Sequence, residues 1–451
     1  MKLPVTVFLL VTVALIEGYN KETPTGESNR LRVGFGSCHK NKRAGSPPIW
    51  DSIRNEALDA WVWTGDAVYT SGRDPQTGKK KYGPATAAEL QLEFDQLKEN
   101  ATIGYRQFLS HKEDFQIYGV WDDHDFGGND IGVSMPDKRE RQQQFWNFLG
   151  YQPHTHDGVY HSFDLQNGKV KLIMLDTRWF RDDHCIPSLA SYVPFGNLIA
   201  CVTRWLTAGL YLHKFAWMWT MDKCEEGDVL GQDQWDWLEA TLAVARANPE
   251  TDAILIVSSV QVLTTGPSME SWGHFPKEQE RLWNLLQHHY SSSMGTATSS
   301  PPVFFLSGDV HHAEISGQKG YLEITSSGMT HHCGQPKLYG RMCKPLLRTF
   351  HKHRHTYNDY FIGLNYGLID FDWASRLMTV DIKDNAGETV LSYSQSLDDR
   401  VTRLESYADL PHTWNGHLIP LLLLVLTLVA FGLRTRRRIQ QDSSSSKFKG
   451  E

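Results

Sequence analysis

Seven short apolar runs constrain the fold of this 451-residue chain more than any other feature of its sequence. Each run is six or seven residues long, rich in β-branched and aromatic residues, and bounded by glycine or polar residues, as buried strands are. The predicted strands are Arg32–Ser37, Ala60–Gly65, Gln116–Trp121, Val170–Asp176, Ala253–Ser259, Val303–Gly308 and Tyr321–Ser327. Between two of them, Trp235, Leu238 and Leu242 share one face of a helical pattern. The alternation predicts an α/β domain with helices covering its sheets.

The N-terminal residues have a composition that does not fit this core. Residues 1–18 place Lys2 before an apolar run and end in small or polar residues, which is the layout of a secretory signal peptide. A buried N-terminal strand is the alternative. It is less favoured because a polar stretch, interpreted as a linker over 19–30, follows the run. We therefore expect the main domain to cover residues 31–410.

The C-terminal residues predict a membrane anchor. The uncharged apolar run Leu418–Leu433 is close to the ~20 residues of a spanning helix, so we expect a transmembrane helix over 417–433. Four arginines between 434 and 438 follow it, and positive charge favours the cytoplasmic side. A lipid-anchor signal would end in its apolar tail, whereas 18 mostly polar and basic residues follow this run. We expect a single-pass type I protein with a cytoplasmic tail at 434–451 and an extracellular or lumenal domain.

Charge and cysteine content limit the partners and the compartment. The chain has 45 Lys and Arg against 52 Asp and Glu, a net charge of −7, which gives no support for nucleic acid as a partner. A secreted context permits disulfides among the six cysteines. Cys333 and Cys343 flank a short loop and are candidates to pair, Cys224 and Cys201 are both candidate partners of Cys185, and the sequence leaves the connectivity open. Asn100 begins a glycosylation sequon.

The segment Cys185–Cys224 interrupts the alternation of strands and helices. It is rich in aromatic residues and shows little helical or strand regularity. Arg204, His213 and Lys214 argue against a second membrane span. Three interpretations remain open: a disulfide-tied insertion, a membrane-facing hairpin, or a translated intron.

Side chains that can bind metals follow four of the predicted strands. They are Cys38 after the first strand, Asp66 and Tyr69 after the second, Asp123, His124 and Asn129 after the third, and Asp309 and His311 after the sixth. In open α/β sheets, ligand sites form just outside the carboxyl ends of strands. We therefore expect these side chains to meet in one cleft.

Repulsion between the carboxylates in such a cleft has to be relieved. Asp66, Asp123 and Asp309 close together would either have raised pKa values or bind cations. Carboxylates suit hard cations such as Ca²⁺, whereas thiolate, imidazole and phenolate suit a transition metal. The mixture of ligand types predicts two unlike metals that share a bridging carboxylate.

For some of these residues, a purely structural role is the alternative to metal binding. Cys38 has the alternative of an inert buried or disulfide cysteine, and Tyr69 that of an ordinary core residue. We expect the neighbouring polar residues to support the site rather than bind metal: Asp122 and Asp125 by orienting a chain segment, His312 and Glu314 by contacting a ligand, and His331 and His332 by lining or capping the cleft. The basic cluster 351–355 is interpreted as a solvated loop.

The motifs together resemble one family. "GFGSC", "WTGDAVY", "VWDDHDFGGND", "LSGDVHHAEI" and "TSSGMTH" resemble, in order, the motif series of PhoD-like alkaline phosphatases, a branch of the calcineurin-like metallophosphoesterases. The likeness extends from about Arg32 to Asp381. It implies a four-layer sandwich of two mixed β-sheets flanked by helices. It also implies hydrolysis of phosphate esters by metal-activated water, with Fe³⁺ and Ca²⁺ as cofactors.

The resemblance also implies roles for single residues. Cys38, Tyr69 and His311 would hold iron, Asp66 would bridge to calcium, Asp123 and Asp309 would complete the calcium side, Asn129 would contact metal or phosphate, and His124 would be catalytic. Two other functions remain: phosphodiesterase or phospholipase D-like activity on lipid head groups, and a non-catalytic surface-binding ectodomain. The latter would show a missing ligand, and every expected ligand is present.

Overall fold

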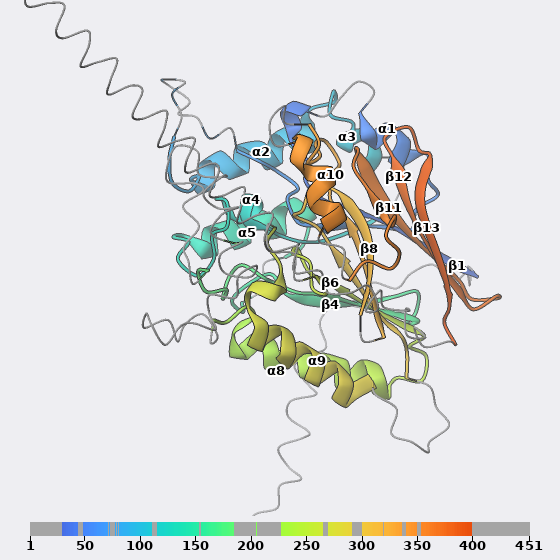
Figure 1. The fold of residues 1–451 in the computed structure, drawn as a ribbon. Helices are drawn as coiled ribbons and strands as arrows, with labels where there is room; N and C mark the ends of the chain where they lie inside the picture. The colour runs from blue at the N-terminus through green and yellow to red at the C-terminus, as the bar shows by residue number, and fades with distance from the viewer. Residues whose placement is uncertain are drawn as a thin grey trace, which may run out of the picture.

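The described part of the chain forms two β-sheets with helices on their outer faces (Figure 1). The structure is a computed structural model. It describes residues 29–43, 48–70, 81–110, 115–152, 155–184, 227–264, 269–290, 300–318, 320–335, 340–349 and 353–398, together with Gly72, Thr77, Lys79 and Arg204. The predicted signal peptide, membrane helix and cytoplasmic tail lie outside these residues, as does all of Cys185–Cys224 except Arg204.

One sheet has six strands in the order β13-β12-β11-β1-β2-β3. Its strands are β1 (Arg30–Gly36), β2 (Ala60–Thr64), β3 (Gln116–Val120), β11 (Asn365–Asp372), β12 (Leu377–Asp384) and β13 (Thr389–Ser396). The pairs β1–β2 and β2–β3 are parallel, while β11, β12 and β13 add an antiparallel meander beside β1. The sheet is therefore mixed.

The other sheet has seven strands in the order β10-β8-β9-β7-β6-β5-β4. Its strands are β4 (His161–Leu165), β5 (Val170–Met174), β6 (Ala253–Val257), β7 (Val303–Ser307), β8 (Ala313–Gln318), β9 (Tyr321–Ser326) and β10 (Tyr360–Phe361). The strands β5, β6, β7 and β9 run parallel, and β4, β8 and β10 pair antiparallel at the two sides. This sheet is mixed as well.

Alternating side chains of the central strands enter two different cores. In β6, Leu255 faces the core between the sheets, while Ile254 and Ile256 face the helices outside. In β2, Val62 faces the same inner core and Trp61 faces the opposite outer one. Because successive strand side chains point to opposite faces, strands buried on both faces are apolar throughout. This explains why the sequence shows these strands as continuous apolar runs.

Helices cover the outer face of each sheet. Packed on the six-stranded sheet are α1 (Ile49–Arg54), α2 (Ala87–Glu99), α3 (Tyr105–Leu109) and α5 (Lys138–Leu149). On the seven-stranded sheet are α8 (Gly231–Ala247) and α9 (Pro276–Tyr290), which lie side by side in Figure 1. The remaining helical elements are α4 (Asp123–Phe126), α10 (Gly340–Thr349), η3 (Asn41–Arg43) and η6 (Trp272–His274). The result is the expected four-layer arrangement.

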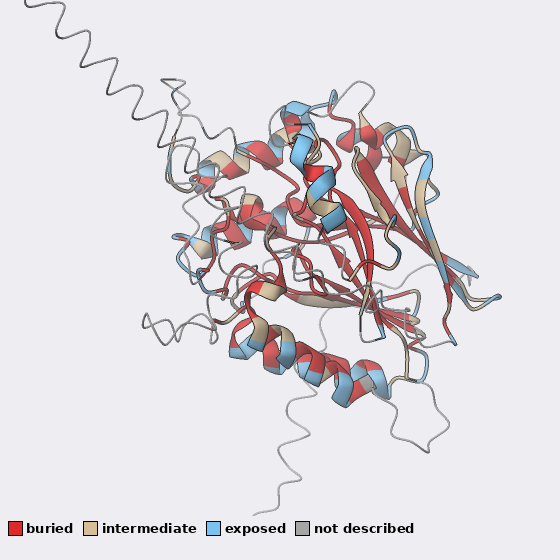
Figure 2. Ribbon diagram, viewed as in Figure 1, coloured by how far each residue is buried: buried red, intermediate tan, exposed pale blue. Residues whose placement is uncertain are grey.

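Burial follows these layers. Figure 2 shows buried residues through the central strands and exposed residues along the outer sides of α8 and α9. In α8, Trp235, Leu238 and Leu242 are buried, which confirms the predicted helix. Cys333 and Cys343 form a disulfide, as the sequence predicted.

The described helices do not include a membrane span. Among them, none is both long and apolar enough to cross a bilayer. Asn100 is exposed at the C-terminal end of α2, so glycosylation of its sequon stays a prediction.

Candidate active site

The parallel strands of both sheets bring their carboxyl ends to one region, and the predicted site residues follow these ends. Cys38 follows β1, Asp66 follows β2, Asp123 begins α4 after β3, and Asp309 follows β7. The two sheets approach closely here, since a Cβ on Gly308 would lie 2.4 Å from the Thr64 carbonyl oxygen. Residues from distant parts of the chain therefore share one buried site.

Several of these residues have an unusual backbone conformation. Cys38, Asp66, Asp309 and His311 have φ values of 62°, 54°, 67° and 57°, in the left-handed region that favours glycine. Such conformations cost about 1–3 kcal/mol each and cluster at functional sites. The fold therefore maintains four of the predicted ligands in strained conformations.

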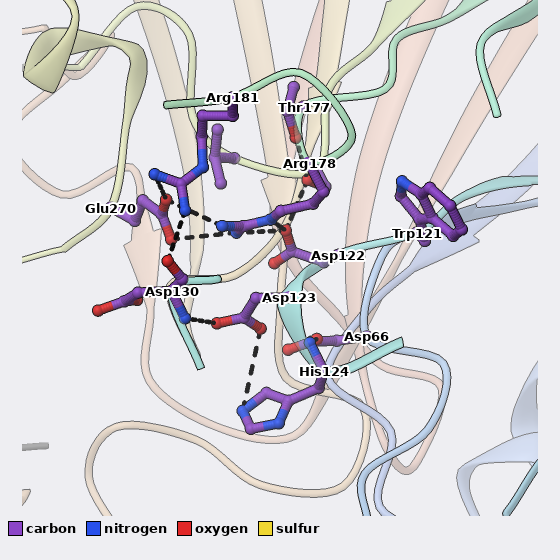
Figure 3. Close-up of polar contacts among 12 residues, drawn as sticks. Asp66, Trp121, Asp122, Asp123, His124, Asp130, Thr177, Arg178, Arg181 and Glu270 are labelled. Atoms are coloured by element: carbon purple, nitrogen blue, oxygen red, sulfur yellow. Dashed lines mark hydrogen bonds and ion pairs between the residues drawn. The ribbon is translucent and has the colours of Figure 1, made fainter. Parts of the chain in front are cut away.

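The carboxylates converge as the sequence predicted. Ligand atoms of Asp66, Asp123 and His124 lie within 4.8 Å of one another, and so do those of Asp122, Asp123 and Asp309. Asp123 belongs to both groups, so the three aspartates that were expected to meet do so. Figure 3 shows Asp66, Asp123 and His124 near one another. Asp66 and Asp123 are buried, and Asp309 is half-buried.

Burial and mutual repulsion make these carboxylates costly as anions. Burial raises the pKa of Asp66 well above its ordinary value, and the charges of Asp123 and Asp122 raise it further. Burial also raises the pKa of Asp123 to about 6, against the opposing effect of Arg178. Burial, followed by the charges of Asp122 and Glu270, raises the pKa of Asp309 well above its ordinary value. Bound cations would allow all three carboxylates to be ionised at the same time.

A thiol and a phenol lie beside Asp66. The Cys38 Sγ is 3.5 Å from Asp66 Oδ2, and the Tyr69 hydroxyl donates to the same oxygen. Cys38 is buried and free, which excludes the disulfide alternative for it. The backbone N–H of His311 donates to Ser327 Oγ at 2.9 Å, and that oxygen lies 3.1 Å from Cys38 Sγ. Contacts thus connect the residues predicted to hold iron to one another and to Asp66.

Three imidazoles surround Tyr69 and the carboxylates. His124 has its ring centre 4.0 Å from that of Tyr69, and its Nε2 lies 3.9 Å from Asp123 Oδ1. The ring centre of His331 lies 5.2 Å from that of Tyr69 and 4.5 Å from that of His311. His331 therefore lines the site, one of the two roles considered for it. Burial lowers the pKa of His311 to about 3, and the charges of Lys40, His124, His312 and Arg204 add to this effect.

Asp122 and Asp125 orient the chain, as expected. Asp125 accepts hydrogen bonds from the backbone N–H groups of Val68 and Asp122 at 3.0 and 3.1 Å. Asp122 Oδ1 accepts from Arg178 Nε at 2.7 Å and from the Ser259 hydroxyl at 2.6 Å. Asp122 also belongs to a carboxylate group that could hold a metal, a role beyond the expected one.

A buried charge network that the sequence analysis missed supports the carboxylates (Figure 3). Arg178 donates to Glu270 through both terminal nitrogens, at 2.9 and 3.0 Å, and Arg181 Nη1 lies 3.3 Å from Glu270 Oε1. Although burial raises the pKa of Glu270, Arg178 and Arg181 lower it well below its ordinary value. Asp130 connects this network to the site, because its backbone N–H donates to Asp123 Oδ2 at 2.7 Å.

Other neighbours partly match the expectations. His312 Nε2 lies 3.6 Å from Glu314 Oε2, so these two residues contact each other. The interpretation of 351–355 as a solvated loop is wrong for Arg354, which is buried and donates to Glu314 Oε2 at 2.7 and 3.0 Å. Asn129 lies half-buried after α4, and its contact to metal or phosphate stays a prediction.

The fold and the site together define a four-layer α/β protein with a buried, carboxylate-rich site suited to metal ions. The chain belongs to the PhoD-like phosphatase family, whose model matches residues 33–329. Membership implies a metal-dependent phosphoester hydrolase. The sequence-based assignment to this family is therefore confirmed.

One solved structure is similar in fold at low sequence identity. The structure of PhoD matches with 15% identity and a TM-score of 0.52, over 83% of this chain and 70% of that chain. GAP50, described as the anchor in the inner membrane complex of Plasmodium, matches with 11% identity over 82% of this chain and 90% of that one. Its TM-score of 0.43 is too low to support an argument about fold. A search of curated proteins finds no significant match.

Proposed function

We propose that this protein is a membrane-anchored, extracytoplasmic phosphatase that hydrolyses phosphate esters at a centre of iron and calcium. The convergence of Asp66, Asp123 and Asp309 carries the proposal, because three carboxylates from separate strand ends, two of them buried and one half-buried, need cationic compensation. Family membership supplies the reaction class.

The unpartnered atoms of the site fit metal ligation. Asp123 Oδ1, Asp122 Oδ2 and His311 Nδ1 are buried without a hydrogen-bond partner. Buried polar atoms are normally satisfied, so these atoms are consistent with a place for ions. The thiol, phenol and imidazole donors beside Asp66 suit iron, and the carboxylates suit calcium. Cys38, Tyr69 and His311 would hold iron, Asp66 would bridge, and Asp123 and Asp309 would hold calcium.

The chain's own groups account for the rest of the proposed mechanism. Bound cations supply Lewis acidity, which activates water as the nucleophile and neutralises charge on the phosphoryl oxygens. Burial, followed by the charge of Lys40, lowers the pKa of His124 to about 3, so its imidazole is neutral at working pH. A neutral imidazole retains one N–H donor. With a side chain 29% exposed, His124 is accessible to donate this hydrogen bond to a phosphoryl or leaving-group oxygen.

The membrane location is part of the proposal and rests on the sequence. The apolar run at 417–433 and the arginines after it support a single span with the domain outside the cytoplasm. Protease treatment of intact cells that express the full chain tests this orientation. Digestion of the domain, with survival of an epitope placed after Glu451, is expected. Survival of the domain and digestion only after permeabilisation would contradict it.

A substrate comparison tests the activity. The full chain, purified in detergent, is assayed with a phosphate monoester, a phosphate diester and a phospholipid. We expect phosphate release from the monoester, loss of that release after chelation, and its recovery on addition of iron and calcium. Preferential release of phospholipid head groups would favour the phospholipase D-like alternative. Absence of both metal and turnover would favour the surface-binding ectodomain.

A further inference from the structure

Two cationic side chains to which the proposed mechanism assigns no contact with substrate lie next to different carboxylates of the cluster. Lys40 lies two residues after Cys38, and its ammonium is 4.2 Å from the ring centre of Tyr69, which donates to Asp66. Arg204 forms an ion pair with Asp130, whose backbone N–H donates to Asp123. Each cation is thus one residue away from a carboxylate of the centre.

A chain of contacts connects the two cations. Tyr69 donates to Asp66, ligand atoms of Asp66 and Asp123 lie within 4.8 Å of each other, and the Asp130 backbone N–H donates to Asp123. The carboxylates of the centre therefore lie along a chain of contacts that has a positively charged side chain at each end.

Lys40 and Arg204 both have hydrogen-bonding capacity that their described contacts do not use. Among the described residues, no carboxylate lies within ion-pair distance of the Lys40 ammonium, which is half-buried. Arg204 uses Nη2 for its contact with Asp130, and its Nε is buried without a partner. Leaving a buried charged donor unsatisfied costs about 1–3 kcal/mol or more. An anionic ligand between the two side chains would satisfy these groups.

We infer that Lys40 and Arg204 bind the phosphoryl group of the substrate and select phosphate monoesters over diesters. This inference rests on the proposed function and names its substrate class. A monoester carries nearly two negative charges at neutral pH, since its second pKa is about 6. A diester carries one charge and has one non-bridging oxygen fewer. Because Coulomb energy scales with charge, two added cations favour the monoester.

Steady-state kinetics of Lys40→Met and Arg204→Met in the full chain test this selection. The probes are p-nitrophenyl phosphate, bis(p-nitrophenyl) phosphate and inorganic phosphate as a product inhibitor. Loss of a charge-assisted contact should raise the monoester KM and the phosphate inhibition constant about 10–100-fold. The values of kcat and of the diester KM should change less than about threefold, because the diester depends less on these charges.

Matched controls separate binding from folding. Lys42 and Arg246 are exposed, so Lys42→Met and Arg246→Met remove the same charges away from the site. Both controls should keep wild-type KM values. Metal content and the thermal unfolding midpoint are measured for every variant. A variant that loses metal is replaced by Lys40→Gln or Arg204→Gln, which keep a polar side chain.

The outcomes distinguish this inference from the proposed function. If the wild-type chain hydrolyses the monoester and both variants keep its KM and inhibition constant, the inference is wrong. A higher kcat/KM in Arg204→Met would also overturn it, because Arg204 would then obstruct the site. If the wild-type chain hydrolyses neither ester, the proposed function fails, and calorimetry with inorganic phosphate decides the inference. Phosphate binding that weakens in both variants supports the inference, and unchanged binding refutes it.

Discussion

Arg178 donates from Nε to Asp122 Oδ1 at 2.7 Å, and both side chains are completely buried. Asp122 follows β3 of the six-stranded sheet, and Arg178 follows β5 of the seven-stranded sheet. The ion pair therefore joins the two sheets beside the carboxylate cluster. Arg178 also binds Glu270, so one guanidinium compensates two buried carboxylates.

Replacing Arg178 by alanine should destabilise the fold strongly. Removal of one partner from a buried ion pair leaves uncompensated charge and costs about 3–5 kcal/mol. We expect the thermal unfolding midpoint to fall by roughly 10 °C. The exposed Arg246→Ala variant serves as control and should unfold within about 1 °C of the wild type. Equal midpoints for Arg178→Ala and the wild type would refute a stabilising role for this network.

Substitution of His124 should separate catalysis from metal binding. His124→Ala removes the proposed hydrogen-bond donor and leaves the ligands Asp66, Asp123 and Asp309 in place. We expect kcat to fall about 10²–10⁴-fold, with metal content unchanged by elemental analysis. His288→Ala, at an exposed histidine, should leave both quantities unchanged. Full turnover in His124→Ala would show that the assigned role is wrong.

The contact between Glu314 and Arg354 should make stability depend on pH under acidic conditions. Burial raises the pKa of Glu314, but His312 and Arg354 outweigh it and lower the value from 4.5 to about 2. A lowered pKa in the folded state stabilises the protein above about 4.5, and this contribution is lost as pH falls towards 2. The shift in the pKa of Glu314 contributes about 3 kcal/mol at most to the free energy of unfolding.

Thermal unfolding of Glu314→Gln between pH 7 and pH 3 measures this dependence. We expect the variant to be less stable than the wild type at pH 7, with the difference shrinking steadily below pH 4.5. The exposed Glu250→Gln variant should follow the wild-type curve. Parallel curves for Glu314→Gln and the wild type would contradict the shift in pKa.

Gly308 tests how closely the two sheets approach at the site. A methyl group there would meet the Thr64 carbonyl oxygen at 2.4 Å and Ser37 Oγ at 2.6 Å. Gly308→Ala should therefore displace Asp309 and reduce both stability and activity. Gly150→Ala, at a positive φ of 86° with open space around it, should cost only about 1 kcal/mol of conformational strain. If Gly308→Ala lowers stability no more than Gly150→Ala does, Gly308 and Thr64 are not packed as closely as these distances indicate.

The central strands were predictable because each enters two cores. All seven predicted strands are present, with ends that differ by one or two residues, since burial on both faces makes them apolar. The antiparallel strands β11–β13 were missed. In β12, polar residues such as Asp381 and Lys383 alternate with buried ones, so the strand does not stand out as an apolar run.

The carboxylates were predictable from their place after strands, but their compensating partners were not. Arg178 and Glu270 are 92 positions apart, and only the tertiary fold brings them together. The sequence "LDTRWFRDDH", which contains both Arg178 and Arg181, spans the end of a predicted strand and the residues after it. This position would have indicated both arginines as candidate site residues. Arg204 lies in a segment without regular patterning, so no local feature indicated its contact with Asp130.

Elemental analysis of the purified full chain tests the central claim most directly. Wild-type protein, prepared without chelators, is compared with Asp66→Ala and with Asp95→Ala, an exposed aspartate on α2. We expect the wild type and Asp95→Ala to retain iron and calcium in stoichiometric amounts. Asp66→Ala should lose metal together with phosphate release. Equal metal content in Asp66→Ala and the wild type, or a wild-type chain that binds no metal, would contradict a cation-compensated carboxylate centre.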